Sequence, residues 1–397
     1  MVVVIGGGVT GAAVSYYLSK ISRGEEPVTI IDAVDKPWRN GSSLGAGAFL
    51  AESWGDGSRT EALHRRSFAM HARLAKELGL TSYAELPVFG VKWDEQANTN
   101  DATIPWLAGT SHAPLPGRSA QVDPTELVGR LFERAIEMGA REVTASVTGL
   151  QIESNQITAI VLNDGEDIHK INGEDTVCFA LGPWSSRLED WLNIPTPIEG
   201  IWSTSCLWEP QSPETDANVM GREPTAIFCE EDTQGCHLEV LPRADNSLYV
   251  SGCGLSRVLS PSVMRSSEAP KPGDTNRPDP SRVAAACRSL DALYPGLTSG
   301  KPPDITRACI RPVSADGVPI VGRIPGVENA MIATGGGPWG ITFGPVIGHS
   351  VARLLLDDDP PISLRDLNPR RFDTPIYRTL LKQRGKQAMG KSIGEQY

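Results

Sequence analysis

The chain has too little positive charge to suggest a nucleic acid or an anionic membrane as its partner. Its 397 residues hold 37 lysines and arginines against 48 aspartates and glutamates, a formal net charge of −11. Phosphate-rich partners select basic surfaces, and no long basic run offsets the overall acidity. We therefore expect no nucleic acid and no lipid surface among its partners.

Long hydrophobic runs are also lacking. No apolar stretch approaches the ~20 residues of a membrane-spanning helix, and no basic segment precedes an apolar one near Met1. The final Glu395-Gln396-Tyr397 is not a peroxisomal Ser-Lys-Leu signal. These features predict that the protein has no membrane span and a cytoplasmic location.

The cysteine pattern gives no sign of disulfides or structural zinc. The seven cysteines are odd in number and contain no Cys-x-x-Cys pair. Cys229, Cys236 and His237 form a metal-like cluster, but their spacing fits no standard site. We expect buried thiols and no metal.

What the sequence does contain is a dinucleotide-binding unit in its first 32 residues. The strand-like run VVVI opens into Gly6-Gly7-Gly8-Val9-Thr10-Gly11, a helix pattern follows, and a second strand pattern, VTIID, ends at Asp32. Gly6 permits a tight turn, Gly8 leaves room for a pyrophosphate, and Gly11 allows helix and strand to pack closely. The helix N-terminus favours phosphates, and Asp32 stands where a carboxylate binds a ribose diol.

Further elements follow along the chain. Glu61 to Leu78 has the spacing of an amphipathic helix, and Asp123-Pro124 begins another that continues to Met138. The runs EVTASVTGL, QITAIVLN and DTVCFALG predict strands, the last ending near Gly182, where a buried parallel strand would meet a ligand crevice. Strand-like runs separated by prolines and acidic loops then predict a mixed or antiparallel sheet.

The length exceeds that of a usual single core, so we predict two domains. The expected fold is α/β, with a discontinuous Rossmann-like domain and an inserted mixed or antiparallel β-sheet domain for the substrate. The predicted boundaries are 1–81, 118–194 and 302–357 for the Rossmann-like domain, 82–117 and 195–301 for the substrate domain, and 358–397 for a C-terminal tail.

Several segments besides the glycine fingerprint form a recognisable set. They are the loop expected at 41–47 (GSSLGAG) and the segments 180–185 (ALGPWS), 309–322 (CIRPVSADGVPIVG) and 333–340 (ATGGGPWG). Together they resemble the D-amino-acid oxidase superfamily of FAD enzymes, which includes glycine oxidase, sarcosine oxidase and the fructosyl amino acid oxidases. The SSLGAGAFLAESW and GGGPWGITFGP segments are most similar to a fungal group of FAD oxidoreductases in this superfamily.

The resemblance implies that the Rossmann-like domain is an FAD-binding domain and that the flavin ring lies between the two domains. The glycine-rich segment 335–340 precedes a helix expected near Ile341. The N-terminus of this helix would face the flavin C2 carbonyl. The alternative is that the segment forms a plain turn before the helix. Ser42 and Ser43 would offer hydroxyls to phosphate, or are ordinary loop serines. The cofactor contacts expected are Gly6, Gly8, Val9, Thr10, Gly11, Asp32, Ser42, Ser43, Gly45, Ala46, Gly47, Val147, Gly182, Trp184, Gly336, Gly337, Pro338, Trp339, Gly340 and Ile341.

Arg311 and Tyr249 are the expected catalytic positions. Arg311 falls where glycine oxidase and D-amino-acid oxidase place the arginine that binds the substrate carboxylate. The alternative is a structural arginine paired with Asp316 or a carbonyl. Tyr249 aligns loosely with the lysine that activates oxygen in sarcosine oxidase, and this departure leaves the reaction with oxygen open, although glycine oxidase manages without that lysine.

Cys309 has two interpretations. It falls where sarcosine oxidase and the fructosyl amino acid oxidases carry the cysteine bonded covalently to flavin, which would make it a further cofactor contact. The alternative, which we favour slightly, is a small buried hydrophobic residue.

The remaining candidates are aromatic residues and histidines. Trp54, Trp184, Trp202 and Trp339 would form an aromatic box around an amine or cation, or else pack at a domain interface. His64 and His237 have no visible base partner, but amine oxidation by hydride transfer needs no strong base when the amine arrives neutral.

Two classes of function follow from this pattern. The first is FAD-dependent oxidation of a C–N bond in an amino acid, N-alkyl amino acid or related secondary amine. The hydride passes to flavin N5, and reoxidation by O2 releases H2O2, with a dehydrogenase that uses another acceptor as a variant. The second is a flavoprotein with a structural or regulatory role. An NAD(P)H-dependent reaction is disfavoured because the chain has no second GxGxxG unit, and the sequence leaves the oligomeric state open.

Overall fold

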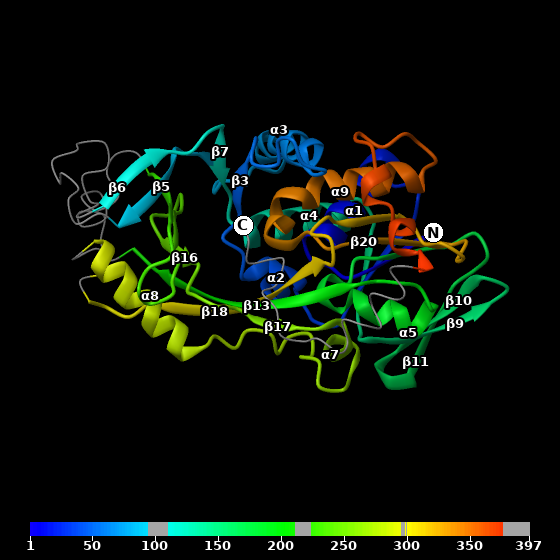
Figure 1. Cartoon of the computed structure of the whole chain (residues 1–397). Helices are drawn as coiled ribbons and strands as arrows, with labels where there is room; N and C mark the ends of the chain where they lie inside the picture. The colour runs from blue at the N-terminus through cyan, green and yellow to red at the C-terminus, as the bar shows by residue number, and fades with distance from the viewer. Residues whose placement is uncertain (94–109, 211–223, 295–297, 299, 376–397) are drawn as a thin grey trace.

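The computed structural model describes residues 1–93, 110–210, 224–294, 298 and 300–375, and Figure 1 shows how they are arranged. The predicted N-terminal unit is confirmed as strand β1 (Val2–Ile5), helix α1 (Val9–Ile21) and strand β2 (Val28–Asp32). Its two strands are parallel, with Val2 opposite Val28 and Ile5 opposite Ile31. The first turn of α1 therefore begins at the carboxyl end of β1, as a βαβ unit requires.

A six-stranded sheet is built around β1. It has the order β19-β20-β12-β1-β2-β8, and all its neighbouring pairs are parallel except the antiparallel pair β19 and β20. The added strands are β8 (Arg141–Thr144), β12 (Thr176–Phe179), β19 (Ile320–Arg323) and β20 (Ala330–Thr334). The chain leaves β1 for β2 on one side and returns to β12 on the other, so a crevice opens at the carboxyl ends of β1 and β12.

Alternate side chains of β1 enter two different cores. Val2 and Val4 pack with the helices, whereas Val3 and Ile5 pack with the opposite layer. The helical layer contains α1, α3 (Glu61–Leu78), α4 (Pro124–Glu137) and α9 (Gly340–Leu355). The opposite layer is a three-stranded antiparallel sheet of β9 (Val147–Glu153), β10 (Gln156–Leu162) and β11 (Asp167–Lys170). Figure 1 shows this sheet at the edge of the molecule.

The second large sheet has eight strands, in the order β17-β13-β16-β15-β14-β5-β6, with β18 paired to the other edge of β13. Its pairs are antiparallel except for the parallel pair β14 and β5. Its strands are β5 (Val88–Trp93), β6 (Thr110–Pro114), β13 (Ile198–Trp208), β14 (Ala226–Cys229), β15 (Glu239–Pro242), β16 (Leu248–Ser251), β17 (Arg257–Leu259) and β18 (Ile305–Ser314). The sheet confirms the predicted mixed, largely antiparallel architecture.

Two elements join the sheets. Strand β13 is the longest in the described chain, and Figure 1 shows it and β18 running from the eight-stranded sheet towards the six-stranded one. A small sheet of β3 (Phe49–Ala51), β7 (Ser119–Gln121) and β4 (Ala84–Glu85) lies beside α9 and α3. Strand β18 falls inside the range 302–357 predicted for the Rossmann-like domain. It nevertheless pairs with β13 along its whole length and so belongs to the eight-stranded sheet.

Two local predictions are wrong. EVTASVTGL is not one strand, because β8 ends at Thr144 in the six-stranded sheet and β9 begins at Val147 in the three-stranded one. The segment 41–47 is not wholly a loop, because Gly41–Leu44 form the short helix α2. The remaining long helix is α8 (Pro280–Leu293), and the other short helices are Pro37–Arg39, Asn163–Gly165, Gly182–Arg187, Leu188–Leu192, Pro261–Arg265, Gly337–Trp339, Arg365–Leu367 and Pro369–Phe372.

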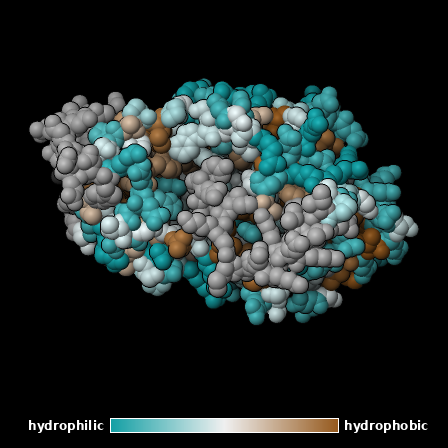
Figure 2. All heavy atoms as spheres, viewed as in Figure 1, coloured by the Kyte–Doolittle hydropathy of each residue, from teal (hydrophilic) through white to brown (hydrophobic). Residues whose placement is uncertain are grey.

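The surface is mostly polar. Figure 2 shows a largely hydrophilic face on which hydrophobic residues form separate small areas. Among the described helices, none combines the length and apolarity needed to cross a bilayer. All seven cysteines are free, and five of them lie in or against the core between α8 and the eight-stranded sheet. The last part of the predicted tail, 376–397, lies outside the described residues.

Candidate functional site

A cavity of about 940 Å³ lies between the two large sheets. It extends from the carboxyl ends of β1 and β2 past α2 to one face of the eight-stranded sheet. Its volume is at the upper end of the range for small-molecule sites. All the predicted cofactor contacts except Gly11 lie on its wall, including Val147 and Gly182 at strand and helix ends. Gly11 instead packs against the Gly6 carbonyl.

The glycine fingerprint forms the tight end of this cavity. Gly6 has a φ of +106°, and a side chain there would overlap the Ala180 carbonyl oxygen. A Cβ at Gly11 would overlap the Gly6 carbonyl oxygen, so only glycine allows α1 to begin this close to β1. An added Cβ at Gly8 would overlap no backbone atom, because Gly8 faces the cavity. The nearest atom would be Ser43 Oγ at 3.4 Å.

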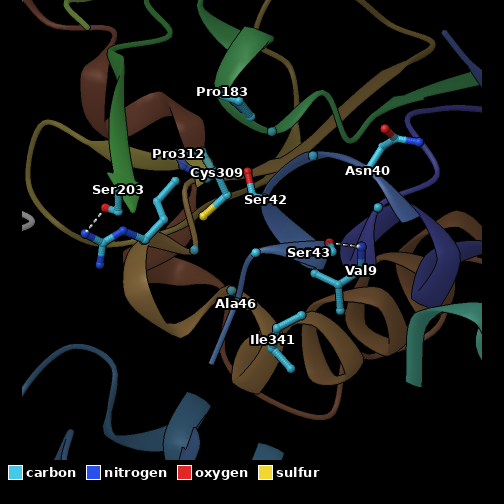
Figure 3. A pocket seen from close by; sticks show the side chains of 18 of the residues that line it. Val9, Asn40, Ser42, Ser43, Ala46, Pro183, Ser203, Cys309, Pro312 and Ile341 are labelled. Carbon is cyan, nitrogen blue, oxygen red and sulfur yellow. Dashed lines mark hydrogen bonds between the residues drawn. The ribbon is translucent and has the colours of Figure 1, made fainter. Parts of the chain in front are cut away.

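The first turn of α1 is available to an anion. Its N-cap residue, Gly8, offers no side chain to the free N–H groups. Val9 N donates to Ser43 Oγ over 3.1 Å, as the dashed line in Figure 3 shows. Thr10 also lies on the cavity wall. A helix end of this kind favours phosphate through its dipole and its remaining N–H groups.

Asp32 is fixed at the end of β2 by backbone groups. Its carboxylate accepts hydrogen bonds from Gly7 N at 2.7 Å and Val34 N at 3.1 Å. Burial raises the pKa of Asp32, and the Gly7 N–H opposes this shift. The carboxylate keeps lone pairs facing the cavity, which suits the predicted ribose contact.

Both α2 serines have protein partners. Ser42 Oγ donates to the Ile310 carbonyl of β18, and Ser43 Oγ accepts from Val9 N. They tie α2 to β18 on one side and to α1 on the other, and Figure 3 shows Ser42 between Cys309 and the α1 end. Their predicted phosphate contacts stay a prediction.

The residues after α2 pack tightly against the eight-stranded sheet. The Tyr249 hydroxyl donates to the Gly45 carbonyl over 2.7 Å. A Cβ at Gly45 would come within 2.6 Å of Cys309 Cβ, and one at Gly47 within 2.8 Å of the Tyr249 ring. Ala46 lies on the cavity wall between them. Tyr249 therefore holds this segment, and burial raises the pKa of its phenol.

Cys309 and Arg311 stand on the cavity face of β18. Cys309 is only 5% exposed, and burial raises the pKa of its thiol, although Arg311 nearby opposes the shift. Arg311 Nη2 donates to Ser203 Oγ over 2.7 Å, the second dashed bond in Figure 3. Arg311 Nε is buried without a hydrogen-bond partner among the described residues.

The alternative pairing of Arg311 with Asp316 is not found. Asp316 binds Arg371 and Arg59 instead, at 3.0 and 2.9 Å. No described carboxylate or carbonyl binds the Arg311 guanidinium, whose hydrogen bond is to a neutral hydroxyl. A cation that faces a cavity with an unsatisfied N–H is a candidate binder of an anionic ligand group.

The C-terminal glycine segment completes the wall. Gly336 to Gly340 lead through a short helical turn into α9, and Ile341 is the second residue of α9. Neither the turn nor α9 has a side-chain cap at its N-terminus. The free N–H groups of α9 therefore begin at the cavity, as the resemblance implies for the flavin C2 carbonyl.

Comparison with known families identifies the fold. The family model described as “DAO: FAD dependent oxidoreductase” matches residues 1–354. The chain belongs to this family. Its cofactor is FAD, and the predicted fold class is that of the family.

Relatives of the DAO family align over nearly the whole chain. A Schizosaccharomyces pombe protein described as an oxidoreductase, C1F5.03c, is 22% identical over 386 residues, covering 90% of this chain and 94% of its own length. Mouse peroxisomal sarcosine oxidase is 22% identical over 398 residues, with coverages of 94% and 96%. Glycine oxidase from Geobacillus kaustophilus has a similar structure, with a TM-score of 0.74, 20% identity, and coverages of 93% and 98%.

The cavity of this DAO-family chain fits FAD. Two helix N-termini without side-chain caps, those of α1 and α9, face one elongated hollow, and the Asp32 carboxylate stands at the end nearest the fingerprint. Gly8 leaves the space that a pyrophosphate needs. The residues of the fingerprint, α2 and the α9 start would hold the cofactor.

The four tryptophans do not form one box. The ring centroids of Trp54 and Trp339 lie 5.7 Å apart, and Trp54 also packs on Phe49 and Phe228 at 5.2 and 5.0 Å. Trp184 and Trp202 pack elsewhere and donate their ring N–H groups to the carbonyls of Pro270 and Thr275. The structure thus brings Trp54 and Trp339 together, whereas Trp184 lines another part of the cavity and Trp202 is not on its wall.

The histidines have different surroundings. His64 Nδ1 lies 3.0 Å from the Ala51 carbonyl, its ring contacts Trp339, and burial lowers its pKa. His237 lies on the cavity wall. Within the described ranges, no group of three or more His, Cys, Asp or Glu side chains is placed to hold a metal.

Sequence reasoning missed the polar residues of the eight-stranded sheet that face the cavity. Ser203 of β13 and Glu239 of β15 lie on its wall, and Phe228 of β14 lies beside Glu239. A signal was present, because GIWSTSCLW and HLEVLP are otherwise apolar strand patterns that contain polar residues, with Ser203 and Ser205, and His237 and Glu239, two positions apart on one face.

Proposed function

We propose that the protein oxidises a C–N bond of an amino acid, an N-alkyl amino acid or a related secondary amine to an imine. The observation that supports this proposal best is the Arg311 guanidinium, which faces the cavity with no described carboxylate partner. When bound, FAD would supply a two-electron acceptor for the hydride at its N5, and O2 would serve as the final oxidant, giving H2O2.

The role of Arg311 is to position the substrate. A guanidinium binds a carboxylate through two parallel charge-assisted hydrogen bonds, and this fixes the direction of the neighbouring Cα–H bond. Ser203 holds one arm of the guanidinium and leaves other N–H groups for the ligand. Aromatic side chains of Trp54, Phe228 and Trp339 exclude water from the same cavity.

No strong base is required of the protein. The His64 ring, whose pKa is lowered by burial, stays neutral and bound to the Ala51 carbonyl. An amine that enters uncharged can lose a hydride without prior removal of a proton. The hydrogen-bond donors that begin α9 stabilise negative charge that develops beside them.

A dehydrogenase that uses another electron acceptor is the second candidate. It is favoured by the neutral, buried Tyr249, which aligns loosely with the lysine that activates oxygen in sarcosine oxidase. A flavoprotein with little turnover is the third candidate. It would be favoured if no amine entered the cavity.

The test is an anaerobic screen of the FAD-loaded protein against amino acids and N-methyl amino acids, followed by visible absorption. Bleaching by a substrate, with colour and H2O2 appearing when air is admitted, supports the oxidase. Bleaching that persists in air but is reversed by an artificial acceptor supports the dehydrogenase. No bleaching by any amine contradicts amine oxidation and favours the structural role.

A further inference from the structure

The cavity face of the eight-stranded sheet carries a second charged residue besides Arg311. Glu239 of β15 lies on the wall, and its Oε2 accepts a hydrogen bond from Ser251 Oγ over 2.7 Å. Among the described residues, no arginine, lysine or histidine lies within ion-pair distance of Glu239. Of the described strand residues of the eight-stranded sheet that line the cavity, Arg311 and Glu239 are the charged ones, and each is held by a serine.

Strand register shows that these charges share one sheet face. Paired residues of antiparallel strands point to the same side, and Glu239 is opposite Ser251. Cys206 is opposite Val250, so continuing this register by one residue places Ser205 across from Ser251. Ser203 is two residues further along β13 and so lies on the same face.

The register also gives the separation of the two serines that hold these charged side chains. Neighbouring strands lie about 5 Å apart, and two residues span about 7 Å along a strand. Ser203 and Ser251, which hold the two charges, are therefore roughly 8 Å apart. An extended lysine or arginine is comparable in length to this part of the sheet face, so its two ends can lie over the two serines.

Aromatic rings lie beside Glu239. Phe228 is its partner in the β14–β15 register, and the Trp54 ring is 5.0 Å from the Phe228 ring. All three residues line the cavity. A carboxylate next to aromatic faces is a favourable environment for an organic cation, because ionic and cation–π attraction act together.

We propose that Glu239 determines specificity by binding a cationic side-chain group of the substrate, which is therefore an α-amino acid with a basic side chain. This inference rests on the proposed function, since it takes Arg311 as the site of the substrate carboxylate. Ser251 orients the Glu239 carboxylate, and Phe228 and Trp54 contact the substrate methylene groups and cation.

The test compares lysine with norleucine, which has a similar aliphatic chain but no terminal charge. Both enantiomers of each are titrated into the FAD-loaded protein by calorimetry, and flavin reduction is followed separately under anaerobic conditions. We expect one enantiomer of lysine to bind about tenfold or more tighter than its norleucine counterpart, as a charge-assisted hydrogen bond in a cavity provides. Glu239→Gln should abolish this preference and leave norleucine binding within about twofold.

Glu174→Gln is the matched control. Glu174 is exposed in a loop outside the cavity wall, so the same chemical change there should leave the lysine preference intact. The comparison of lysine with norleucine in the unaltered protein needs no variant, so it tests the inference even if Glu239→Gln does not fold.

The two proposals fail in different ways. Equal binding of lysine and norleucine, or an unchanged lysine preference in Glu239→Gln, overturns the assignment of Glu239, even if a neutral amino acid reduces the flavin. Tight lysine binding that depends on Glu239, without flavin reduction by any amine, supports the cation site and overturns the proposed oxidation.

Discussion

Arg311 is the residue on which the proposed reaction depends most. Replacing it with alanine removes charge-assisted hydrogen bonds that contribute roughly 1.5–3 kcal/mol each, so KM for a carboxylate substrate should rise about tenfold to a hundredfold or more. Arg311→Lys keeps the charge but not the paired geometry and should recover part of the loss. Steady-state kinetics on the two variants give the comparison, and FAD absorbance should be unchanged in both. Unaltered kinetics would exclude the carboxylate contact and favour an uncharged amine.

Cys309 illustrates how burial opposes covalent chemistry at a single thiol. The thiolate is the reactive form, and burial raises the pKa of Cys309. We therefore expect FAD to be bound without a covalent link, so that acid precipitation leaves a colourless pellet and a yellow supernatant. Cys309→Ala should give the same result. A yellow pellet from the unaltered protein that becomes colourless in Cys309→Ala would show the covalent link instead.

The sequence identified Arg311 and Cys309, but not the groups that determine their properties. Ser203, which binds Arg311, is 108 residues away in the chain. Asp316, a local partner expected for Arg311, binds Arg371, 55 residues further on. Motifs are short and continuous, so they can indicate which residue carries a charge, whereas its partner depends on how distant strands pair.

At the level of elements, an added methyl group should have different effects at two glycines of the turn between β1 and α1. A Cβ at Gly11 overlaps the Gly6 carbonyl oxygen, whereas one at Gly8 has room towards Ser43. Gly11→Ala should lower the free energy of unfolding by about 3 kcal/mol or more through overpacking, or prevent folding. Gly8→Ala should change it by less than about 1 kcal/mol but weaken FAD binding at least about tenfold, because its methyl group occupies the cofactor side.

Urea unfolding without added FAD, together with FAD titration, separates the two glycine variants. Each serves as the control for the other, since both add one methyl group within the same fingerprint. Gly8→Ala with unaltered FAD affinity would remove Gly8 from the proposed pyrophosphate site. Equal stability of both variants would contradict the close packing of α1 on β1.

Elements with a strong local pattern were predictable and elements defined by pairing were not. The apolar spacing of 61–78 and the cap at Asp123 led to the correct positions of α3 and α4, because both signals lie within the segment. The change of sheet at Ala145 and Ser146 has no such signal, since a strand pattern is the same whichever sheet accepts it. The four-residue helix α2 contains little more than one helical turn, which is too short for hydrophobic spacing to reveal.

For the whole molecule, the order of the chain does not follow the order of the layers. Strand β18 lies in 302–357, the last of the three segments predicted for the FAD-binding domain, yet it completes the eight-stranded sheet and carries Cys309 and Arg311 to the cavity. The α/β class and the mixed second sheet could be predicted from composition and pattern. The boundary between them could not, because β13 and β18 extend from one sheet towards the other.

His71 links two of the helices that cover the six-stranded sheet. It lies on α3, and its Nε2 is 3.1 Å from the carbonyl oxygens of Ile341 and Thr342 at the start of α9. Both partners are acceptors, so Nε2 carries the proton and the neutral ring is the form bound. Nδ1 is buried without a partner in the described structure, so a second proton would have no acceptor there.

This arrangement predicts that acid destabilises the whole fold through His71. Burial lowers the pKa of His71 from 6.5 to about 4, so between these values the unfolded chain binds a proton that the folded protein does not. The stabilisation is fully present above pH 6.5 and is lost as the pH falls to about 4, by about 3 kcal/mol at most. His71→Gln can still donate to the two carbonyls but does not titrate, so its free energy of unfolding should fall less steeply over this range. Urea unfolding of both proteins from pH 7 to pH 4 measures the difference. If the free energy of unfolding falls equally with pH in both, other groups cause the acid sensitivity, because only His71 differs between the two proteins.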